Sequence, residues 1–131
     1  MTREDIRRIP ELNNRILRDE AQLRYLKEMA TAVPALSADE RVQTSKKYDR
    51  MKYVDAAVDL ELELKDRIDE LKELKEEAGE WISTLDTSLE KRIFKLRLKA
   101  CLTWDEVADI IGYSRRRTFE IVEKTLKDKA E

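Results

Sequence analysis

The sequence predicts an all-α protein, and three observations support this fold class. Only two glycines and two prolines occur among 131 residues, and charged residues make up 43% of the chain. Apolar residues recur at helical spacing over most of its length. A β-sandwich needs frequent turn residues, and the loops of a nucleotide-binding α/β fold need glycines that are missing here. We expect a long helical hairpin or coiled-coil arm over residues 1–80 and a compact helical unit over residues 81–131.

The first predicted helix runs from about Asp5 to Ala32 and carries a heptad pattern. Its seam has apolar side chains at alternating steps of three and four, and Asp19 occupies the one position without such a side chain. The seam consists of Ile9, Leu12, Ile16, Leu23, Leu26, Ala30 and Val33. Pro10 is unfavourable within a helix, so a start of the first turn at Pro10 is the alternative to a start near Asp5, and the helix should end before Pro34.

A connector without helical period is expected over residues 31–46, because it contains Pro34 and several hydroxyl residues. Ser37 and Glu40 have the spacing of a capping box, but Ser45 is the preferred cap of the next helix.

The second long helix is expected from about Lys46 to Gly79, where glycine favours a break. Leu60 and Leu62 widen its apolar stripe, which consists of Met51, Val54, Val58, Leu64, Ile68, Leu71, Leu74 and Ala78. Neither long helix can bury its stripe alone, so they pair as an antiparallel hairpin in one chain or as a coiled coil between chains. After Gly79, a helical apolar face continues through Trp81, Ile82, Leu85, Leu89, Ile93 and Leu96.

The most specific pattern, over residues 102–131, is that of a helix-turn-helix. Thr103 and Glu106 form a capping box for a helix that begins at Trp104. The expected core of the motif consists of Val107, Ala108, Ile111, Gly112, Thr118 and Ile121, with Thr125 and Leu126 further along. Ala108 allows close approach of the two helices, and Gly112 suits the left-handed backbone that ends the first of them. Ser114 then caps the second helix.

The outward positions of this second helix suggest contact with DNA. Arg115 and Arg116 are candidate base readers, since an arginine can donate two hydrogen bonds to guanine. Arg117, Lys124 and the helix terminus at Ser114 are candidate phosphate contacts. Phe119 either contacts a thymine methyl group or packs back on the first helix, which we favour. Glu120 and Glu123 also face outward, and one of them could accept a hydrogen bond from cytosine.

Charge is divided unevenly along the chain, in a way that agrees with this assignment. Residues 1–85 hold 16 basic and 20 acidic side chains (net −4), and residues 86–131 hold 11 and 9 (net +2). Residues 59–80 contain ten acids and four bases, which form a solvated face or bind a basic partner. The run 91–99 has five bases and no acid, and it is either a phosphate contact or a solvated face.

Catalytic and metal chemistry is not expected, because the chain has no histidine and one cysteine. Histidine ligands, histidine-activated nucleophiles, an intrachain disulfide and cysteine-clustered zinc are therefore excluded. We expect Cys101 to be a small buried side chain, and Trp81 and Trp104 to be core or interface anchors. The prediction is a protein that is not an enzyme and has no cofactor or metal.

The run from Lys91 to Leu126 resembles region 4 of bacterial sigma factors. It is more similar to phage and prophage late-gene transcription activators of the RinA and ArpU-like group. The residues that carry the similarity are Thr103-Trp104-Asp105-Glu106-Val107-Ala108 and Tyr113-Ser114-Arg115-Arg116-Arg117. A weaker similarity covers Arg41 to Ser45 and Asp49 to Met51. The resemblance implies sequence-specific binding near phage promoters and contact with RNA polymerase.

Three residues depart from the pattern of that group. Glu120 and Glu123 stand where basic, polar or small residues are usual, and Thr118 replaces valine or isoleucine. Acidic side chains there repel phosphates, so a monomer is expected to bind DNA modestly and to need a second copy or a partner.

The function predicted from the sequence is a phage-type DNA-binding transcription regulator. The expected partners are double-stranded DNA, RNA polymerase and further copies of the chain bound through the N-terminal helices. The rival is an adaptor or polymerase-binding factor without DNA contact, and a small terminase-like packaging subunit ranks third. No apolar run approaches the roughly 20 residues of a membrane span, and the N-terminus lacks a signal peptide, so a cytoplasmic location is expected, in the host cell if the chain is phage-encoded.

Overall fold

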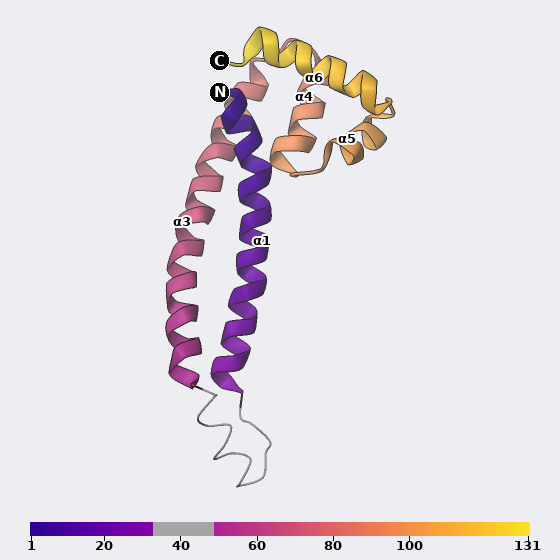
Figure 1. Ribbon diagram of the computed structural model, residues 1–131. Coiled ribbons are helices and arrows are strands. Elements are labelled where there is room, and N and C mark those ends of the chain that lie inside the picture. The colour runs from indigo at the N-terminus through magenta and orange to yellow at the C-terminus, as the bar shows by residue number, and fades with distance from the viewer. Residues whose placement is uncertain (33–48) are drawn as a thin grey trace. The chain divides into compact units, whose positions relative to one another are not determined.

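A computed structural model describes residues 1–32 and 49–131, and within these ranges every regular element is a helix (Figure 1). The α-helices are α1 (Arg3–Thr31), α3 (Arg50–Ser83), α4 (Ser88–Phe94), α5 (Trp104–Ile111) and α6 (Arg115–Lys129), and a short π-helix, η1 (Lys95–Lys99), follows α4 directly. The predicted all-α class is confirmed.

The chain divides into two compact units. Unit 1 joins Met1–Asn14 to Asp69–Glu131, and unit 2 is the continuous stretch Arg15–Ile68. Both α1 and α3 therefore contribute to each unit. The sequence-based division into residues 1–80 and 81–131 concerns domains and stays a prediction.

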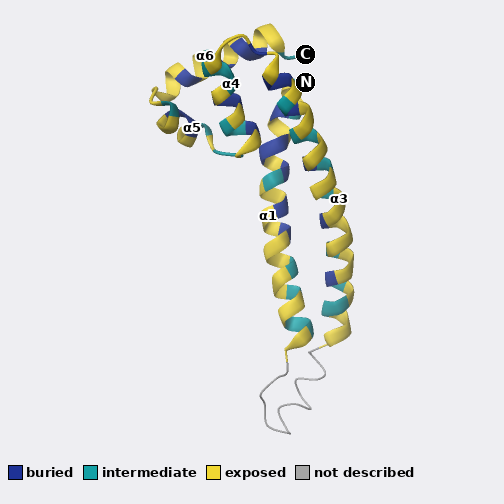
Figure 2. Ribbon diagram, turned by 180° about the vertical axis from the view of Figure 1, so that it is seen from behind, coloured by how far each residue is buried: buried dark blue, intermediate teal, exposed yellow. Residues whose placement is uncertain are grey.

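In unit 2 the remainder of α1 pairs with the beginning of α3 within one chain. Asp19 Oδ2 lies 2.5 Å from Arg67 Nη1, and Lys27 Nζ lies 3.4 Å from Glu61 Oε1. From the first pair to the second, the residue number rises along α1 and falls along α3, so the two segments are antiparallel. Their buried positions face each other along this seam (Figure 2).

The buried seam of α3 differs from the predicted stripe. Every seventh residue is buried, namely Ala57, Leu64, Leu71 and Ala78. The expectation that Met51, Val58 and Ile68 belong to the buried side was wrong, because all three are exposed. Met51 and Val58 are exposed because the buried seam repeats every seven residues from Ala57. Both positions lie roughly 100° or more around the helix axis from Ala57.

The first helix begins earlier than expected. Helix α1 starts at Arg3, and Pro10 lies inside it instead of at its first turn. Pro10 leaves the carbonyl of Ile6 without its helical N–H donor. Burial of Ile6, Ile9 and Leu12 in unit 1 offsets this loss and extends the helix to both sides of the proline.

The predicted break at Gly79 was also wrong, since α3 continues to Ser83. Burial of Ala78, Trp81 and Ile82 on the two sides of the glycine holds this stretch helical. A reciprocal pair of hydrogen bonds joins α3 to η1 here: Lys75 Nζ donates to the Lys99 carbonyl at 3.2 Å, and Lys99 Nζ donates to the Lys75 carbonyl.

The core of unit 1 collects apolar side chains from every helix that contributes to it. Phe94, Ile93 and Leu98 are fully buried at its centre, under α6. The other buried members are Ile6, Ile9, Leu12, Leu71, Ala78, Trp81, Ile82, Leu85, Val107, Ala108, Val122 and Leu126. The predicted helical face after Gly79 is thus buried at most positions, with Leu89 and Leu96 half-buried.

Several predictions lie outside the described residues. They are the connector up to Lys46, the competing caps Ser37 and Ser45, the start of the second helix before Asp49, and the similarity over Arg41 to Ser45.

Candidate nucleic-acid interface

Helix α5 begins at the capping box that the sequence predicts. The Thr103 hydroxyl accepts a hydrogen bond from the Glu106 backbone N–H at 3.2 Å, and the Thr103 backbone N–H donates to the Glu106 carboxylate at 3.2 Å. These bonds satisfy two groups that a helix start leaves unpaired. The helix then buries Val107 and Ala108 toward α6 and η1.

A three-residue turn, Gly112 to Ser114, connects α5 to α6. Gly112 has φ 86° and ψ 19°, and its N–H donates to the Ala108 carbonyl at 2.9 Å. This left-handed C-cap confirms the role predicted for Gly112. Ser114 caps α6, because its hydroxyl accepts from the Arg117 N–H at 3.1 Å. The cap fixes where the helix starts, and Arg115, Arg116 and Arg117 form its first turn.

A chain of aromatic rings supports this pair of helices. Trp81 meets Phe94 edge-on at 4.9 Å, Phe94 meets Trp104 edge-on at 6.3 Å, and Trp104 lies 6.0 Å from Phe119. The Trp81 indole N–H donates to the Lys129 carbonyl at 3.1 Å and holds the far end of α6. Edge-on rings at these separations stabilise the core beyond the area they bury. Both tryptophans thus contribute to packing, and Phe119 contacts Trp104, although it remains partly exposed.

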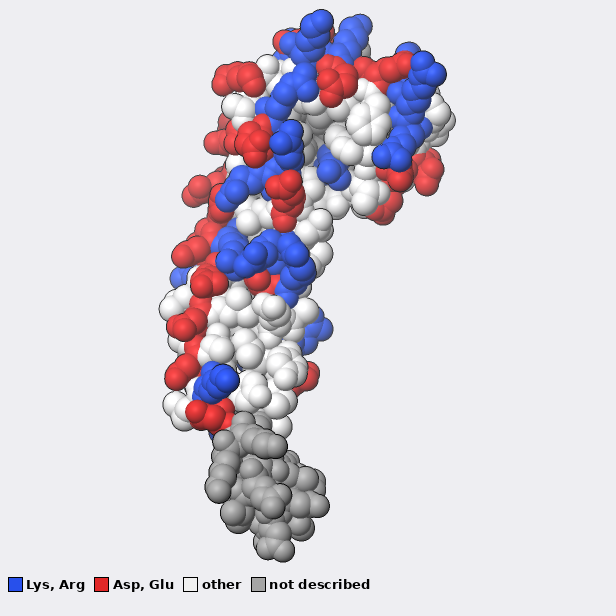
Figure 3. Space-filling model, viewed as in Figure 1, with Lys and Arg blue, Asp and Glu red and all other residues white. Residues whose placement is uncertain are grey.

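The three arginines of α6 are exposed to solvent. Their side chains are 68%, 92% and 64% accessible for Arg115, Arg116 and Arg117. Figure 3 shows basic side chains gathered at the end of α6 that adjoins α5. Cations at the start of an exposed helix are positioned to approach a polyanion.

Carboxylates accompany these arginines. Arg115 Nε lies 3.2 Å from Asp105 Oδ1 on α5, and its guanidinium carbon lies 5.8 Å from the Phe119 ring centroid. Glu120 lies 3.6 Å from Arg116 and 3.5 Å from Arg117. Ion pairs this exposed contribute little to stability, so the arginines can exchange them for another anion at small cost.

Arg97 is a further cation of this region, and it is turned inward. Its guanidinium lies 4.9 Å from the Trp104 ring centroid, and Nη1 donates to the Leu102 carbonyl at 2.7 Å. Burial lowers the pKa of Arg97 from its usual value, and the nearby Cys101 opposes that shift. Arg97 therefore supports the loop before α5, where it is half-buried.

Cys101 itself is half-buried, not fully buried as expected. It has φ 55°, in the left-handed region, and the Leu102 N–H donates to the Leu96 carbonyl at 3.2 Å across it. The bond reaches back six residues, one more than in a Schellman C-cap, because it closes the end of a π-helix, and cysteine occupies the left-handed position where glycine is usual.

The predicted core of the motif is buried in part. Val107, Ala108 and Thr118 are buried, Ile111 and Ile121 are half-buried, and Gly112 is exposed at the turn. Val122, which was not among the predicted core residues, is buried one position after Ile121. Thr118 and Thr125 are accommodated because their hydroxyls donate to the Ser114 and Ile121 carbonyls at 3.0 and 2.9 Å.

The other residues of α6 that were predicted to face DNA lie on its surface. Lys124, Glu120 and Glu123 are exposed, and Glu123 lies 3.4 Å from Arg3 of α1. In the basic run 91–99, Arg92, Lys95 and Lys99 are exposed. Sequence reasoning missed the Asp105–Arg115 pair and the inward turn of Arg97, because both depend on how two helices cross, which no spacing within one helix reveals.

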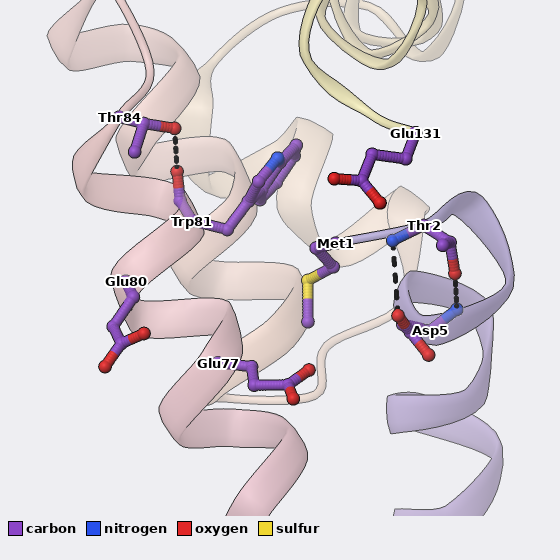
Figure 4. Close-up of a pocket in the computed structure, with 8 residues that line it drawn as sticks. All are labelled: Met1, Thr2, Asp5, Glu77, Glu80, Trp81, Thr84 and Glu131. Carbon is purple, nitrogen blue, oxygen red and sulfur yellow. Dashed lines mark hydrogen bonds between the residues drawn. The ribbon is translucent and has the colours of Figure 1, made fainter.

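A cavity of about 440 Å³ is lined by Met1, Thr2, Asp5, Glu77, Glu80, Trp81, Thr84 and Glu131 (Figure 4). Thr2 and Asp5 bond to each other there, with Thr2 N donating to Asp5 Oδ2 at 3.2 Å. Among residues 1–32 and 49–131 no cluster of acids, cysteine or histidine has the arrangement of a metal site. None of the helices in these ranges combines the length and apolar character that crossing a membrane requires.

Comparisons with protein-family models, with curated proteins and with solved structures found no match to this chain.

Proposed function

We propose that this chain is a phage-type DNA-binding transcription regulator, in which α5, the turn at Gly112 and α6 act as a helix-turn-helix and α1 with α3 forms a helical hairpin arm. The observation that carries the proposal is the exposure of Arg115, Arg116 and Arg117 at the first turn of α6. In helix-turn-helix proteins the beginning of the second helix enters the major groove. The proposal assigns the chain no reaction and no cofactor.

The three arginines have different roles in this proposal. Arg115 and Arg116 read bases, because a guanidinium matches the two acceptors of guanine in the major groove. Stacking on Phe119 and pairing with Asp105 restrict the Arg115 side chain before binding, which lowers the entropy lost on contact. Arg117 and Lys124 contact phosphates and contribute affinity that does not depend on sequence.

Glu120 limits the affinity. It lies against both Arg116 and Arg117, and its charge opposes phosphate approach. Binding therefore exchanges the Glu120 pairs for DNA contacts, and non-specific affinity is held down. This agrees with the expectation that one copy binds modestly.

The proposal is tested with a duplex enriched from a random-sequence pool by the intact chain, titrated against random duplex at several salt concentrations. The double variant Arg115→Ala/Arg116→Ala should reduce the preference for the enriched duplex by at least about 30-fold, because each of the two lost guanine contacts weakens discrimination by about 1–3 kcal/mol. Affinity of the intact chain should fall as a power of salt concentration, since phosphate contacts release counterions.

The matched control is Arg18→Ala/Arg24→Ala, which removes the same charge from exposed positions of α1. It should retain the sequence preference. Preference unchanged in the Arg115 and Arg116 variant would overturn the proposal. No duplex binding by the intact chain, even at low salt, would favour the adaptor that makes no DNA contact. Contact with RNA polymerase and self-association through the N-terminal helices stay predictions.

A further inference from the structure

Unit 2 has an apolar stripe that its own helix pair does not use. Met51, Val58 and Leu62 of α3 are 60%, 50% and 62% exposed. Their spacing of seven and four residues places them on one side of the helix, over a length of about 16 Å. That side lies roughly 100–160° around the axis from the seam residues Ala57 and Leu64, which are buried. The stripe is therefore distinct from the surface that pairs with α1.

An acidic row borders this stripe. Asp55, Asp59 and Asp66 are exposed and share the side of α3 next to Leu62. Acidic side chains follow the edge of α3 that faces away from α1 (Figure 3). None of these three aspartates forms an ion pair with another residue in the described ranges. Carboxylates without cationic partners leave a net negative edge beside an apolar surface.

The combination of stripe and acidic row selects the kind of partner. We propose that this face of α3, consisting of Met51, Val58, Leu62 and the three bordering aspartates, docks a basic amphipathic helix of another protein. Apolar side chains at intervals of about one and two turns fit the matching stripe of a second helix. Lysine or arginine beside that stripe would neutralise Asp55, Asp59 and Asp66, and complementary charge sets both the orientation and the rate of association.

Two other occupants fit this face less well. A second copy would bring two acidic rows together, and like charges across an interface oppose association. A nucleic acid would be repelled by the aspartates. The inference is independent of the proposed DNA contact, because that contact involves residues of unit 1 only.

The test uses the full chain and two labelled amphipathic peptides of about 15 residues. Both peptides carry a leucine stripe, and they differ in having lysine or glutamate beside it. Fluorescence anisotropy should show that the lysine peptide binds at least about tenfold more tightly than the glutamate peptide. Leu62→Ser should weaken binding of the lysine peptide about tenfold, because it removes apolar contact area. Replacing the three aspartates with asparagine should weaken it and reduce its salt dependence.

Tyr25→Ser is the matched control, since it removes an exposed apolar side chain of α1 that lies outside the stripe. It should leave peptide affinity unchanged, and circular dichroism should confirm that all variants keep their helicity. Equal affinity for the two peptides, or full affinity in Leu62→Ser, would overturn the proposal. Sedimentation showing a dimer that Leu62→Ser abolishes would overturn it as well, because the face would then belong to a second copy.

Discussion

Asp19 is the one charged residue in the seam of α1, and Arg67 is its counterpart in α3. Arg67 follows the buried Leu64 by three residues, on the same side of α3, and its Nη1 lies 2.5 Å from Asp19 Oδ2. Asp19 also lies 3.2 Å from Arg15 and is almost fully buried. A charged pair within an apolar seam favours one alignment of the two helices, because any shift leaves both charges against apolar neighbours.

Removing one partner of this pair should destabilise unit 2. Asp19→Ala leaves Arg67 without its buried partner, and we expect the free energy of unfolding to fall by about 1–3 kcal/mol, because Arg67 retains some access to water. Urea unfolding followed by circular dichroism measures this change. Glu63→Ala is the matched control: it removes an exposed pair with the same arginine and should cost less than about 0.5 kcal/mol.

The double variant Asp19→Leu/Arg67→Leu should restore the stability of the intact chain or exceed it, because an apolar seam needs no desolvation of charge. Equal losses in Asp19→Ala and Glu63→Ala would contradict the role assigned to the buried pair.

The two glycines of the chain occupy different positions in their helices, one inside α3 and one at the C-terminal end of α5. Gly79 lies inside α3, and a β-carbon there would lie 3.0 Å from the Nζ atom of Lys99, the flexible end of a long side chain. Gly112 has no neighbour within 4 Å of such an atom, but its φ of 86° is rarely adopted by other residues. At Gly79 a β-carbon meets a movable side-chain end, whereas at Gly112 the backbone conformation itself disfavours any residue with a β-carbon.

Alanine substitution should therefore have opposite effects at these two positions. Gly79→Ala should raise the free energy of unfolding by about 0.5–1 kcal/mol, because alanine favours a helix interior and Lys99 can move aside. Gly112→Ala should lower it by about 1 kcal/mol or more, because alanine is strained at positive φ. Thermal unfolding of both variants measures the difference. A destabilised Gly79→Ala would mean that the hydrogen bonds of Lys99 hold it in place.

Unit 1 is built from two ends of the chain. Ile6, Ile9 and Leu12 of α1 are buried members of a unit whose other residues begin at Asp69. A fragment limited to residues 81–131 would lack these side chains and the buried Leu71 and Ala78 of α3. A chain of about 50 residues buries a small fraction of its surface and has little stability to lose.

We therefore expect the fragment 81–131 to be far less stable than the same residues in the full chain. Each fully buried leucine or isoleucine contributes about 1.5–3 kcal/mol, so loss of the three side chains from α1 is comparable to the whole stability of a small domain. The fragment should show low helicity and no cooperative thermal transition by circular dichroism. Joining residues 1–14 and 69–80 to it through a flexible linker should restore the transition. Cooperative unfolding of the short fragment at the full-chain temperature would instead support the division at residue 80.

Local patterns of the sequence determined the all-α class, both helix caps around α5 and α6, the left-handed turn at Gly112 and the heptad of α1 with its gap at Asp19. These features depend on residues within one or two turns of one another, so spacing is enough to predict them. The tertiary structure alone decided that Arg67 fills the gap at Asp19, that α3 passes through Gly79, that Arg97 turns inward and that Val122 is buried. Each of these depends on which distant side chain covers which face, because burial and charge pairing between helices can override the preferences of a single segment.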